Sequence, residues 1–249
     1  MTTTFGPDFD AAALATLAPE LADVFTAAGF TTDGVAGYLG PEVTEALFRG
    51  EPAPVSLAAQ SESQMDLLIR FFLLHEHLPA TLLGEAVGAR LATQLLDAKV
   101  ALADAHGMAY IALDIRPHTI VGANRLIFSD VDASLVDHVP GPDHVLGVGA
   151  ASLSLLQSTP VSPVSSVLDL GTGSGVQLLG QIECAEKITA TDVHERALDL
   201  ATATIAAAGE GDKVELLPGS WFEPVAGRRF DRLVANPPFV VGLPEVGHV

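Results

Sequence analysis

An apolar stretch that runs into a glycine turn and then into a helical pattern is the strongest constraint on this fold. The segment at residues 167–175 reads VLDLGTGSG, and strand-like and helix-like patterns alternate after it. The predicted elements are strands at 164–170, 187–191, 213–217 and 230–235 and helices at 174–184 and 195–208. Strands joined by right-handed helical crossovers form a parallel sheet. We therefore expect an α/β, doubly wound, Rossmann-like unit over residues 161–249.

The first 107 residues predict helices instead. Apolar side chains recur at three- and four-residue steps, as in Leu14, Leu17, Leu21 and Phe25, and Gly29 follows as a stop signal. The predicted helices cover 11–28, 42–48, 63–75, a stretch from Pro79, and 89–105, with a break at Pro52 and Pro54. Short strands are expected at 108–115, 118–122 and 125–128, with turns at Arg116-Pro117 and Ala123-Asn124. Three short helices followed by a small hairpin resemble a winged helix.

These patterns divide the chain into three parts. Residues 1–107 are expected to form a helical substrate-recognition domain, and residues 108–160 a β-hairpin with a linker. The linker, from Pro140 to Pro163, is rich in Gly, Pro and Ser. Residues 161–249 would then be the N-terminal half of the α/β domain, because only four strands are present before the chain ends.

Charge and composition exclude several kinds of protein. The chain has 31 acidic and 12 basic side chains, a net charge of −19, and 49% hydrophobic residues, which argues against disorder. Residues 1–105 hold 14 acidic and 4 basic side chains, so the winged-helix-like region gives no strong DNA-binding signal. We expect no membrane segment, because no apolar run approaches the roughly 20 residues that a spanning helix needs. The single cysteine and the absence of a secretory signal favour the cytoplasm.

The glycine turn has the features of a nucleoside-cofactor site. Glycines let the backbone approach a ligand closely, and the start of the following helix offers unpaired N–H groups. Asp192 ends the next strand, 21 residues after Gly171, where a carboxylate can accept hydrogen bonds from both ribose hydroxyls. An NAD enzyme usually shows G-x-G-x-x-G, whereas this chain reads G-x-G-x-G. A tight turn without a ligand remains the simpler alternative for this segment alone.

A second motif, Asn-Pro-Pro-Phe at residues 236–239, follows directly on the strand 230–235. Carboxyl ends of strands are where doubly wound sheets bind ligands. The prolines remove N–H donors and leave carbonyls free to accept. The Asn236 side-chain oxygen and the Pro237 carbonyl together can accept both hydrogens of a planar –NH2 group, and Phe239 can stack on its plane.

With these motifs, residues 161–249 resemble the N-methyltransferase branch of the class I S-adenosylmethionine (SAM) methyltransferases. The stretch GSWFEP at 219–224, followed by RFD at 229–231 and the Asn-Pro-Pro-Phe motif, is especially similar to HemK-type release-factor glutamine methyltransferases. The same motif occurs in ribosomal RNA guanine-N2 and adenine-N6 methyltransferases. The resemblance is strong over about a third of the chain and only loose in the helical front region.

The resemblance implies the roles of particular residues. Asp169, Gly171 and Gly173 would surround the methionine part of SAM, Asp192 would hold the ribose, and Val193 would lie beside the adenine. The whole expected cofactor set is Asp169, Gly171, Thr172, Gly173, Gly175, Asp192, Val193, Ser220, Trp221 and Ser152. Asn236, Pro237 and Phe239 would hold the acceptor nitrogen while it attacks the sulfonium methyl directly. The acceptor would be a glutamine amide of a release factor or ribosomal protein, or an exocyclic amine of an rRNA base.

The sequence departs from the HemK pattern in three places. Ser220 stands where these enzymes usually have an acid that binds the adenine amino group. Residues 145–152 replace their Pro-Arg-Pro-x-Thr-Glu stretch, and Ser152 is the candidate polar contact there. The seven strands of a class I methyltransferase are not all present, which predicts that the rest of a longer protein, or another chain, completes the sheet. The strand 230–235 would otherwise be an uncovered apolar edge.

Other readings stay open beside this one. A non-catalytic module that binds SAM and docks a partner is the main alternative, and an NAD-dependent oxidoreductase is disfavoured by the Asn-Pro-Pro-Phe motif. No metal site is expected, because His75 and His77 point apart on a predicted helix, where a solvated helix end explains them better. Arg228, Arg229 and Arg232 flank the last strand and are candidates for contact with an acidic peptide or an RNA backbone.

Overall fold

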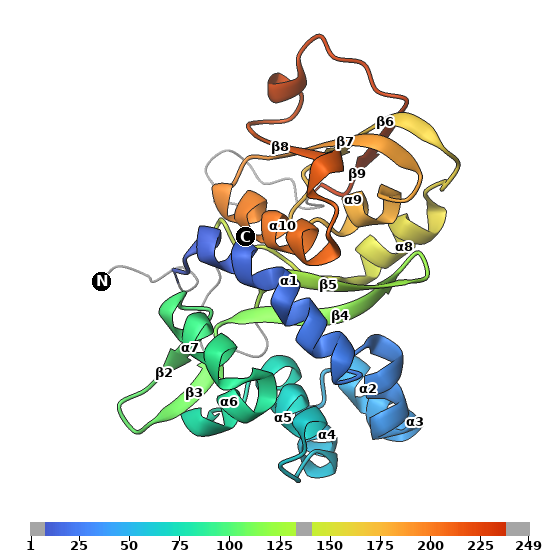
Figure 1. Cartoon of the computed structure of the whole chain (residues 1–249). Helices are drawn as coiled ribbons and strands as arrows, with labels where there is room; N and C mark the ends of the chain where they lie inside the picture. Colours follow the sequence, from blue (N-terminus) through green and yellow to red (C-terminus); the bar gives the residue numbers. More distant parts are fainter. Residues whose placement is uncertain (1–7, 133–140, 238–249) are drawn as a thin grey trace.

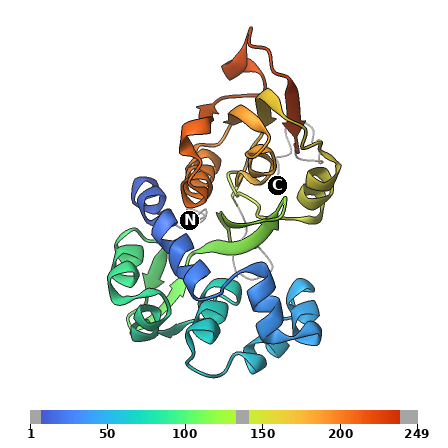
Figure 2. The same ribbon diagram turned by 45° about the vertical axis from the view of Figure 1, so that its right-hand side comes forward.

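The structure, a computed structural model, describes residues 8–132 and 141–237. Helices α1 to α7 and a small sheet lie in one half of the molecule, and a parallel sheet lies in the other (Figure 1). The hairpin of β4 (Leu113–Ile120) and β5 (Ala123–Asp130) runs between the two halves. The turned view shows the same order of layers (Figure 2).

The parallel sheet has the predicted doubly wound topology. Its strands are β6 (Val164–Leu170), β7 (Ala185–Asp192), β8 (Val214–Pro218) and β9 (Arg232–Ala235), in the order β8-β7-β6-β9. The register pairs Leu170 with both Thr191 and Ala235, so the strand ends that precede the two motifs lie next to each other. Strand β9 pairs with β6 alone among the described strands, and its Leu233 is half exposed.

Helices α9 (Val176–Gln181) and α10 (Glu195–Ala208) pack between this sheet and the hairpin. The bounds of α10 agree with the prediction, because apolar spacing and Gly209, at φ +72°, define its end. Helix α9 is shorter than the predicted 174–184. Ser174 and Gly175, which begin the predicted helix, belong to the glycine turn, and Gly175 adopts the left-handed conformation just before α9.

The front half contains seven helices among the described residues. They are α1 (Ala11–Ala27), α2 (Thr32–Leu39), α3 (Pro41–Phe48), α4 (Pro52–Ala58), α5 (Gln64–Leu68) continued by a π-helical turn (Ile69–Leu73), α6 (Ala80–Val87) and α7 (Ala89–Asp97). The predicted break at Pro52 and Pro54 is wrong. Both prolines lie in the first turn of α4, where their missing N–H groups have no intrahelical partner to lose.

The predicted helix 89–105 is also too long. Helix α7 ends at Asp97, and Lys99 has a positive φ of 58° that turns the chain into strand β2 (Ala101–Ala103). Strand β2 pairs with β3 (Met108–Ile111), which also pairs with β1 (Leu78–Pro79). This three-stranded sheet follows short helices, and the winged-helix likeness of the region stays a prediction.

The hairpin turn lies two residues earlier than expected. Strand β4 continues through Pro117, which pairs with Leu126, so there is no turn at Arg116-Pro117. The chain reverses at Val121 and Gly122, both with positive φ, as in the tight turns that suit twisted hairpins. The predicted linker is likewise not wholly irregular, because it contains α8 (Ala150–Ser158).

Two apolar clusters form the core, and the hairpin contributes to both. The larger cluster joins α1 and α7 with one side of α10, and it contains Ile115 and Phe128. The smaller cluster lies between α9, α10 and the parallel sheet, and it contains Ile120 and Ile127. The domain boundaries at residues 107 and 160 stay predictions, but the packing crosses the first of them.

One stretch, Ala11–Leu39, is long and apolar enough to cross a membrane by length and composition. The expectation that no run approaches this length is corrected to that extent. The stretch consists of two helices separated near Gly29, and α1 places Leu14, Leu21 and Phe25 in the core. Helices of a protein core pass the same test, so the stretch is weak evidence for a membrane segment.

Candidate functional site

The candidate site lies at the carboxyl edge of the parallel sheet. Because β6, β7, β8 and β9 run in the same direction, the residues that follow each strand meet at one edge. These are the glycine turn after β6, Asp192 at the end of β7, Gly219 after β8 and Asn236 after β9. The sequence motifs predicted from separate parts of the chain are thus brought together.

The glycine turn leaves open space above two of its three glycines. Gly171 and Gly173 have φ values of +71° and +54°, and a Cβ on either would meet no atom within 4 Å. Backbone N–H groups of Gly171 and Thr172 both donate to the Thr191 carbonyl at 2.9 Å, which fixes the turn against β7. Gly175 differs, because its Cβ would lie 3.4–3.6 Å from side chains of α9 and α10. Gly171 and Gly173 therefore face open space, whereas Gly175 faces the protein.

Asp169 supports the turn from below. Its side chain is buried, and Oδ2 accepts hydrogen bonds from Thr172 Oγ1 at 2.7 Å and from the Leu178 N–H at 3.1 Å. Burial raises the pKa of this carboxyl to about 6, against the lowering effect of those two hydrogen bonds. Its Oδ1 atom has no hydrogen-bond partner among the described residues. Asp169 and Thr172 are thus hydrogen-bonded to each other beneath the glycine turn.

Asp192 is held by the backbone with both carboxylate oxygens. Oδ2 accepts from the Gly173 N–H at 2.9 Å, and Oδ1 accepts from the His194 N–H at 3.0 Å. Each carboxylate oxygen can accept a further hydrogen bond. The Asp192 carbonyl also accepts from the Gly219 N–H at 2.9 Å, which draws the loop that contains Ser220 and Trp221 beside β7.

The residues present fit SAM. The opening above Gly171 and Gly173 suits the methionine part, because backbone there can approach a ligand. Asp192 is fixed in place and keeps acceptor capacity for the ribose hydroxyls. Val193, the next residue, is 61% exposed, and Trp221, two residues after Gly219, is 63% exposed; such apolar surface suits the flanks of an adenine ring.

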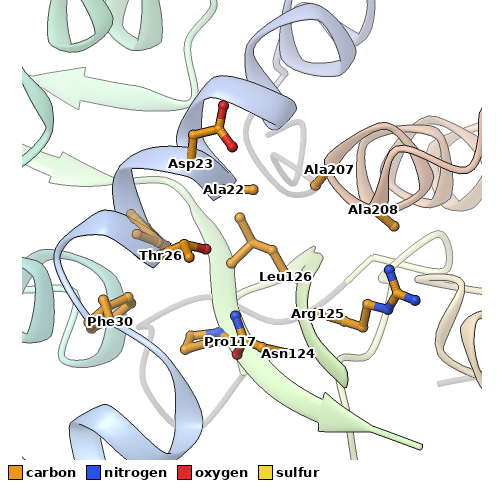
Figure 3. Close-up of a pocket in the computed structure, with 11 residues that line it drawn as sticks. Ala22, Asp23, Thr26, Phe30, Pro117, Asn124, Arg125, Leu126, Ala207 and Ala208 are labelled. Atoms are coloured by element: carbon orange, nitrogen blue, oxygen red, sulfur yellow. The ribbon is translucent and has the colours of Figure 1, made fainter. Parts of the chain in front are cut away.

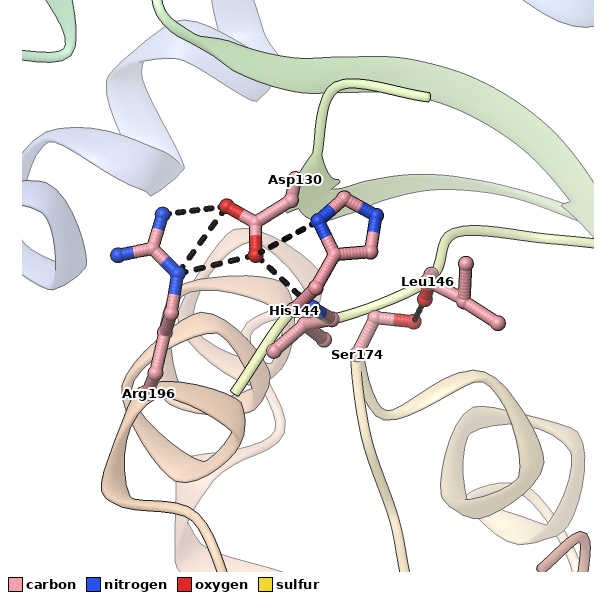
Figure 4. Close-up of polar contacts among 6 residues, drawn as sticks. Asp130, His144, Leu146, Ser174 and Arg196 are labelled. Carbon is pink, nitrogen blue, oxygen red and sulfur yellow. Dashed lines mark hydrogen bonds and ion pairs between the residues drawn. The ribbon is translucent and has the colours of Figure 1, made fainter. Parts of the chain in front are cut away.

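A strap at residues 144–146 crosses to the glycine turn, and sequence reasoning missed what holds it (Figure 4). The buried Asp130 of β5 pairs with Arg196 of α10, whose Nε donates to Oδ2 at 2.9 Å. The same Oδ2 accepts from the Val145 N–H at 2.8 Å, and Ser174 Oγ donates to the Leu146 carbonyl at 3.0 Å. No sequence signal joins Asp130 to Arg196, because the two lie 66 residues apart.

Asn236 lies against α8. Its Nδ2 donates to Ser152 Oγ at 3.3 Å, and the Ser152 carbonyl accepts from Gln177 Nε2 at 2.9 Å. The structure therefore places Ser152 beside the predicted acceptor-binding residue. Pro237 is half buried next to Asn236, and the predicted stacking residue Phe239 lies outside the described residues.

Two of the three candidate arginines are bonded to other groups of the protein. Arg228 forms an ion pair with Glu215, and Arg232 donates to Gln181 and to the Ser162 carbonyl. His75 is also not at a solvated helix end, because it bonds the Ile111 carbonyl and faces Asp114, whereas His77 is exposed. Across the described ranges, no three His, Cys, Asp or Glu side chains group as metal ligands.

A cleft of about 140 Å³ lies elsewhere, between α1, the hairpin and α10 (Figure 3). Asp23 and Thr26 of α1 and Arg125 of β5 line it together with Ala207 and Ala208. The two alanines end α10, whereas Asp192 precedes its start. The cleft is therefore at the opposite end of that helix from the carboxyl edge.

Two domain families match the chain. Residues 27–111 match a domain of unknown function, DUF7059. Residues 146–249 match the methyltransferase small domain. The C-terminal part of the chain is a SAM-dependent methyltransferase domain. This methyltransferase domain contains the glycine turn, Asp192, Ser152 and Asn236, so the resemblance expected from the sequence is confirmed.

Curated relatives and a solved structure are similar to parts of this chain. A release factor glutamine methyltransferase of Agrobacterium fabrum is 27% identical over 195 residues, 65% of this chain and 67% of that protein. One from Gloeobacter violaceus is 40% identical over 76 residues, 30% of this chain and 27% of that protein. The chain thus spans only part of the curated relatives that it matches. A Thermus thermophilus 16S rRNA N2 G1207 methyltransferase in complex with AdoMet and guanosine is 20% identical, with a TM-score of 0.42 over 60% of this chain and 44% of that one.

Proposed function

We propose that this protein transfers a methyl group from SAM to a planar amide nitrogen, the side chain of a glutamine in a translation factor or ribosomal protein. The observation that carries the proposal is the meeting of Asp192 and Asn236 at one sheet edge, on either side of the open glycine turn. The release factor glutamine methyltransferases among the relatives support this acceptor. The cytoplasm, where translation factors work, is the expected location.

Charge favours a protein acceptor over an rRNA base. The chain has a net charge of −19, and contact with nucleic-acid backbone depends on available Lys and Arg. Arg228 and Arg232, the arginines nearest Asn236 in sequence with described contacts, are already paired with protein groups. An exocyclic amine of rRNA is accordingly the second acceptor that the test must include.

The chain's own residues bind and orient the two reactants. SAM supplies an electrophilic methyl group when bound. Gly171, Gly173 and Asp192 hold the cofactor, while Asn236 Oδ1 and the Pro237 carbonyl accept the two N–H hydrogens of the acceptor. These two acceptors direct the nitrogen lone pair along the line of attack, so catalysis is mainly positioning. The acceptor nitrogen would bond the methyl group as that group leaves the sulfonium sulfur, and the surplus proton on nitrogen would go to solvent.

The test separates cofactor binding from transfer. We expect Asp192→Ala to weaken SAM binding more than tenfold in calorimetry, because charge-assisted hydrogen bonds to the ribose are lost. Asn236→Ala is expected to keep SAM binding and to lower methyl transfer roughly 100-fold, because the acceptor nitrogen is no longer oriented. Asn124→Ala, in the distant hairpin, is the matched control and should change neither quantity.

The readout is transfer from tritiated SAM to a release factor and, separately, to methylation-naive ribosomes. Label in the glutamine of a protein supports the proposal. Label in rRNA would overturn the acceptor while keeping the methyltransferase activity. SAM binding without transfer to either acceptor would instead favour the non-catalytic module, and unchanged SAM binding in Asp192→Ala would refute the cofactor site.

A further inference from the structure

Asn236 needs a defined orientation to do what is proposed for it. The carboxamide has an oxygen at one end and an NH2 group at the other, and the two ends have nearly the same shape. With the oxygen toward the acceptor –NH2 the pair forms a hydrogen bond, whereas with NH2 toward –NH2 two donors face each other. A group that accepts a hydrogen bond from the Asn236 NH2 would therefore hold the productive orientation while the acceptor –NH2 bonds the oxygen end.

The structure contains such a group. Asn236 Nδ2 donates to Ser152 Oγ at 3.3 Å, so the NH2 end is turned toward α8. Within residues 8–132 and 141–237, the Asn236 Oδ1 atom makes no hydrogen bond. The two residues are 84 positions apart and belong to different elements, so the contact is a product of the fold.

Ser152 is itself held in place by the glycine-turn helix. Gln177, buried in the first turn of α9, donates from Nε2 to the Ser152 carbonyl at 2.9 Å. Leu156, one turn further along α8, covers Gly180 of α9 so closely that a Cβ there would lie 2.3 Å from its Cδ2. Helix α8 has no buried residue of its own, so these contacts with α9 determine where Ser152 lies.

We infer that Ser152 is a positioning residue that orients the Asn236 carboxamide with Oδ1 toward the acceptor nitrogen. It acts through Asn236 and binds neither reactant. The inference rests on the proposed function for its effect on catalysis, but the orientation of Asn236 is a property of the protein alone. It also revises the expected role of Ser152, which the sequence had suggested as a cofactor contact.

The first experiment observes the orientation without any reaction. In a 1H–15N spectrum of the full chain, the side-chain NH2 signals of Asn236 are identified by their loss in Asn236→Ala. We expect Ser152→Ala to shift these signals, because their hydrogen-bond acceptor is removed, and Ser152→Thr, which keeps a hydroxyl, to restore them. Ser154→Ala, an exposed serine on the same helix, should leave them unchanged. Unchanged Asn236 signals in Ser152→Ala would overturn the inference.

The second experiment measures kinetics with the acceptor found for the wild type. One hydrogen bond of typical strength corresponds to a fall in kcat of roughly 5- to 10-fold for Ser152→Ala, with recovery in Ser152→Thr. SAM affinity should stay within about twofold, and the effect should vanish in an Asn236→Ala background. A loss of SAM affinity parallel to the loss of kcat would return Ser152 to the cofactor site and contradict the inference. Absence of transfer by the wild type would refute the proposed function, while the spectra would still decide the orientation.

Discussion

Asp169 combines two properties in one side chain, a contact that holds the glycine turn and a raised pKa. Its carboxyl accepts hydrogen bonds from Thr172 and from the start of α9, so it ties the glycine turn to the helix that follows. Complete burial raises its pKa to about 6 from an ordinary value of 3.8. Near pH 5 the folded protein therefore keeps a proton that the unfolded chain has released.

This difference predicts a pH dependence that belongs to Asp169. Because the folded-state pKa is raised, its contribution to stability is greatest below pH 4 and is lost as the pH rises to about 6. Relative to Asp169→Asn, which does not titrate, the wild-type free energy of unfolding should fall by up to roughly 3 kcal/mol between pH 4 and pH 7. Urea unfolding at a series of pH values measures the difference.

The control is Asp212→Asn at an exposed position, whose stability curve should follow that of the wild type. If the curves of wild type and Asp169→Asn run parallel from pH 4 to pH 7, the carboxyl does not hold a proton in this range. The pKa assignment would then be refuted, although the hydrogen bonds to the turn would stand.

Residues of the site differ in how far the sequence predicts them. The positions of Asp192 and Asn236 at the sheet edge were predictable, because Asp192 ends one strand, Asn236 directly follows another, and the parallel sheet brings strand ends together. The partnership of Asp130 with Arg196 was not, since it joins a hairpin to a helix that no local pattern connects. Ser152 was predicted as a site residue. Its contact with Asn236 depends on α8, which lies in a segment whose Gly, Pro and Ser content predicted a linker.

The bounds of helices and strands agree with the prediction where the local sequence pattern and the packing favour the same element. Strand β6 and helix α10 have the predicted bounds, because an apolar run and a regular apolar spacing define them. The prediction failed for short elements that neighbours stabilise. Strand β2 exists through its pairing with β3, and α4 begins with prolines that read as a break.

The backbone conformation of Gly219 determines where the loop after β8 runs. Gly219 has a φ of +145°, and a Cβ there would lie 2.5 Å from Cγ of the Pro224 ring. We expect Gly219→Ala to displace the loop that carries Ser220 and Trp221 and to weaken SAM binding about tenfold. The fold should persist, because the strand pairing of β8 ends at Pro218.

Calorimetry with SAM and thermal unfolding by circular dichroism measure the two effects separately. Gly211→Ala is the matched control, because a Cβ at Gly211 meets no atom within 4 Å and its φ is not positive. Wild-type affinity in Gly219→Ala would show that the Trp221 loop lies outside the cofactor site.

At the scale of the whole molecule, the front helices and the methyltransferase domain share apolar packing. The cluster that contains Leu14 and Leu21 of α1 also contains Leu200 and Ala203 of α10. Phe9, just before α1, lies 5.0 Å from the Arg196 guanidinium in a cation–π contact. The two parts are therefore expected to unfold together.

Leu21→Ala tests this coupling, because Leu21 belongs to α1 in the front region and not to the methyltransferase domain. Removal of a buried leucine side chain costs about 2–5 kcal/mol, and the loss should appear in the methyltransferase domain as well. In hydrogen–deuterium exchange, peptides from β6 and β7 should exchange faster in Leu21→Ala than in the wild type. Thr16→Ala, exposed on the same helix, is the control. Unaltered exchange in β6 and β7 would show that the two parts unfold independently.

The β4–β5 hairpin limits how the front region can be exchanged by recombination. Ile115 and Phe128 belong to one cluster and Ile120 and Ile127 to the other, so the same two strands complete both. A recombination event that replaced only the helices before residue 108 would leave the old Ile115 and Phe128 packed against new side chains that do not match them. A new front region would be accepted more readily if it brought its own hairpin, so that the exchanged segment ends after β5.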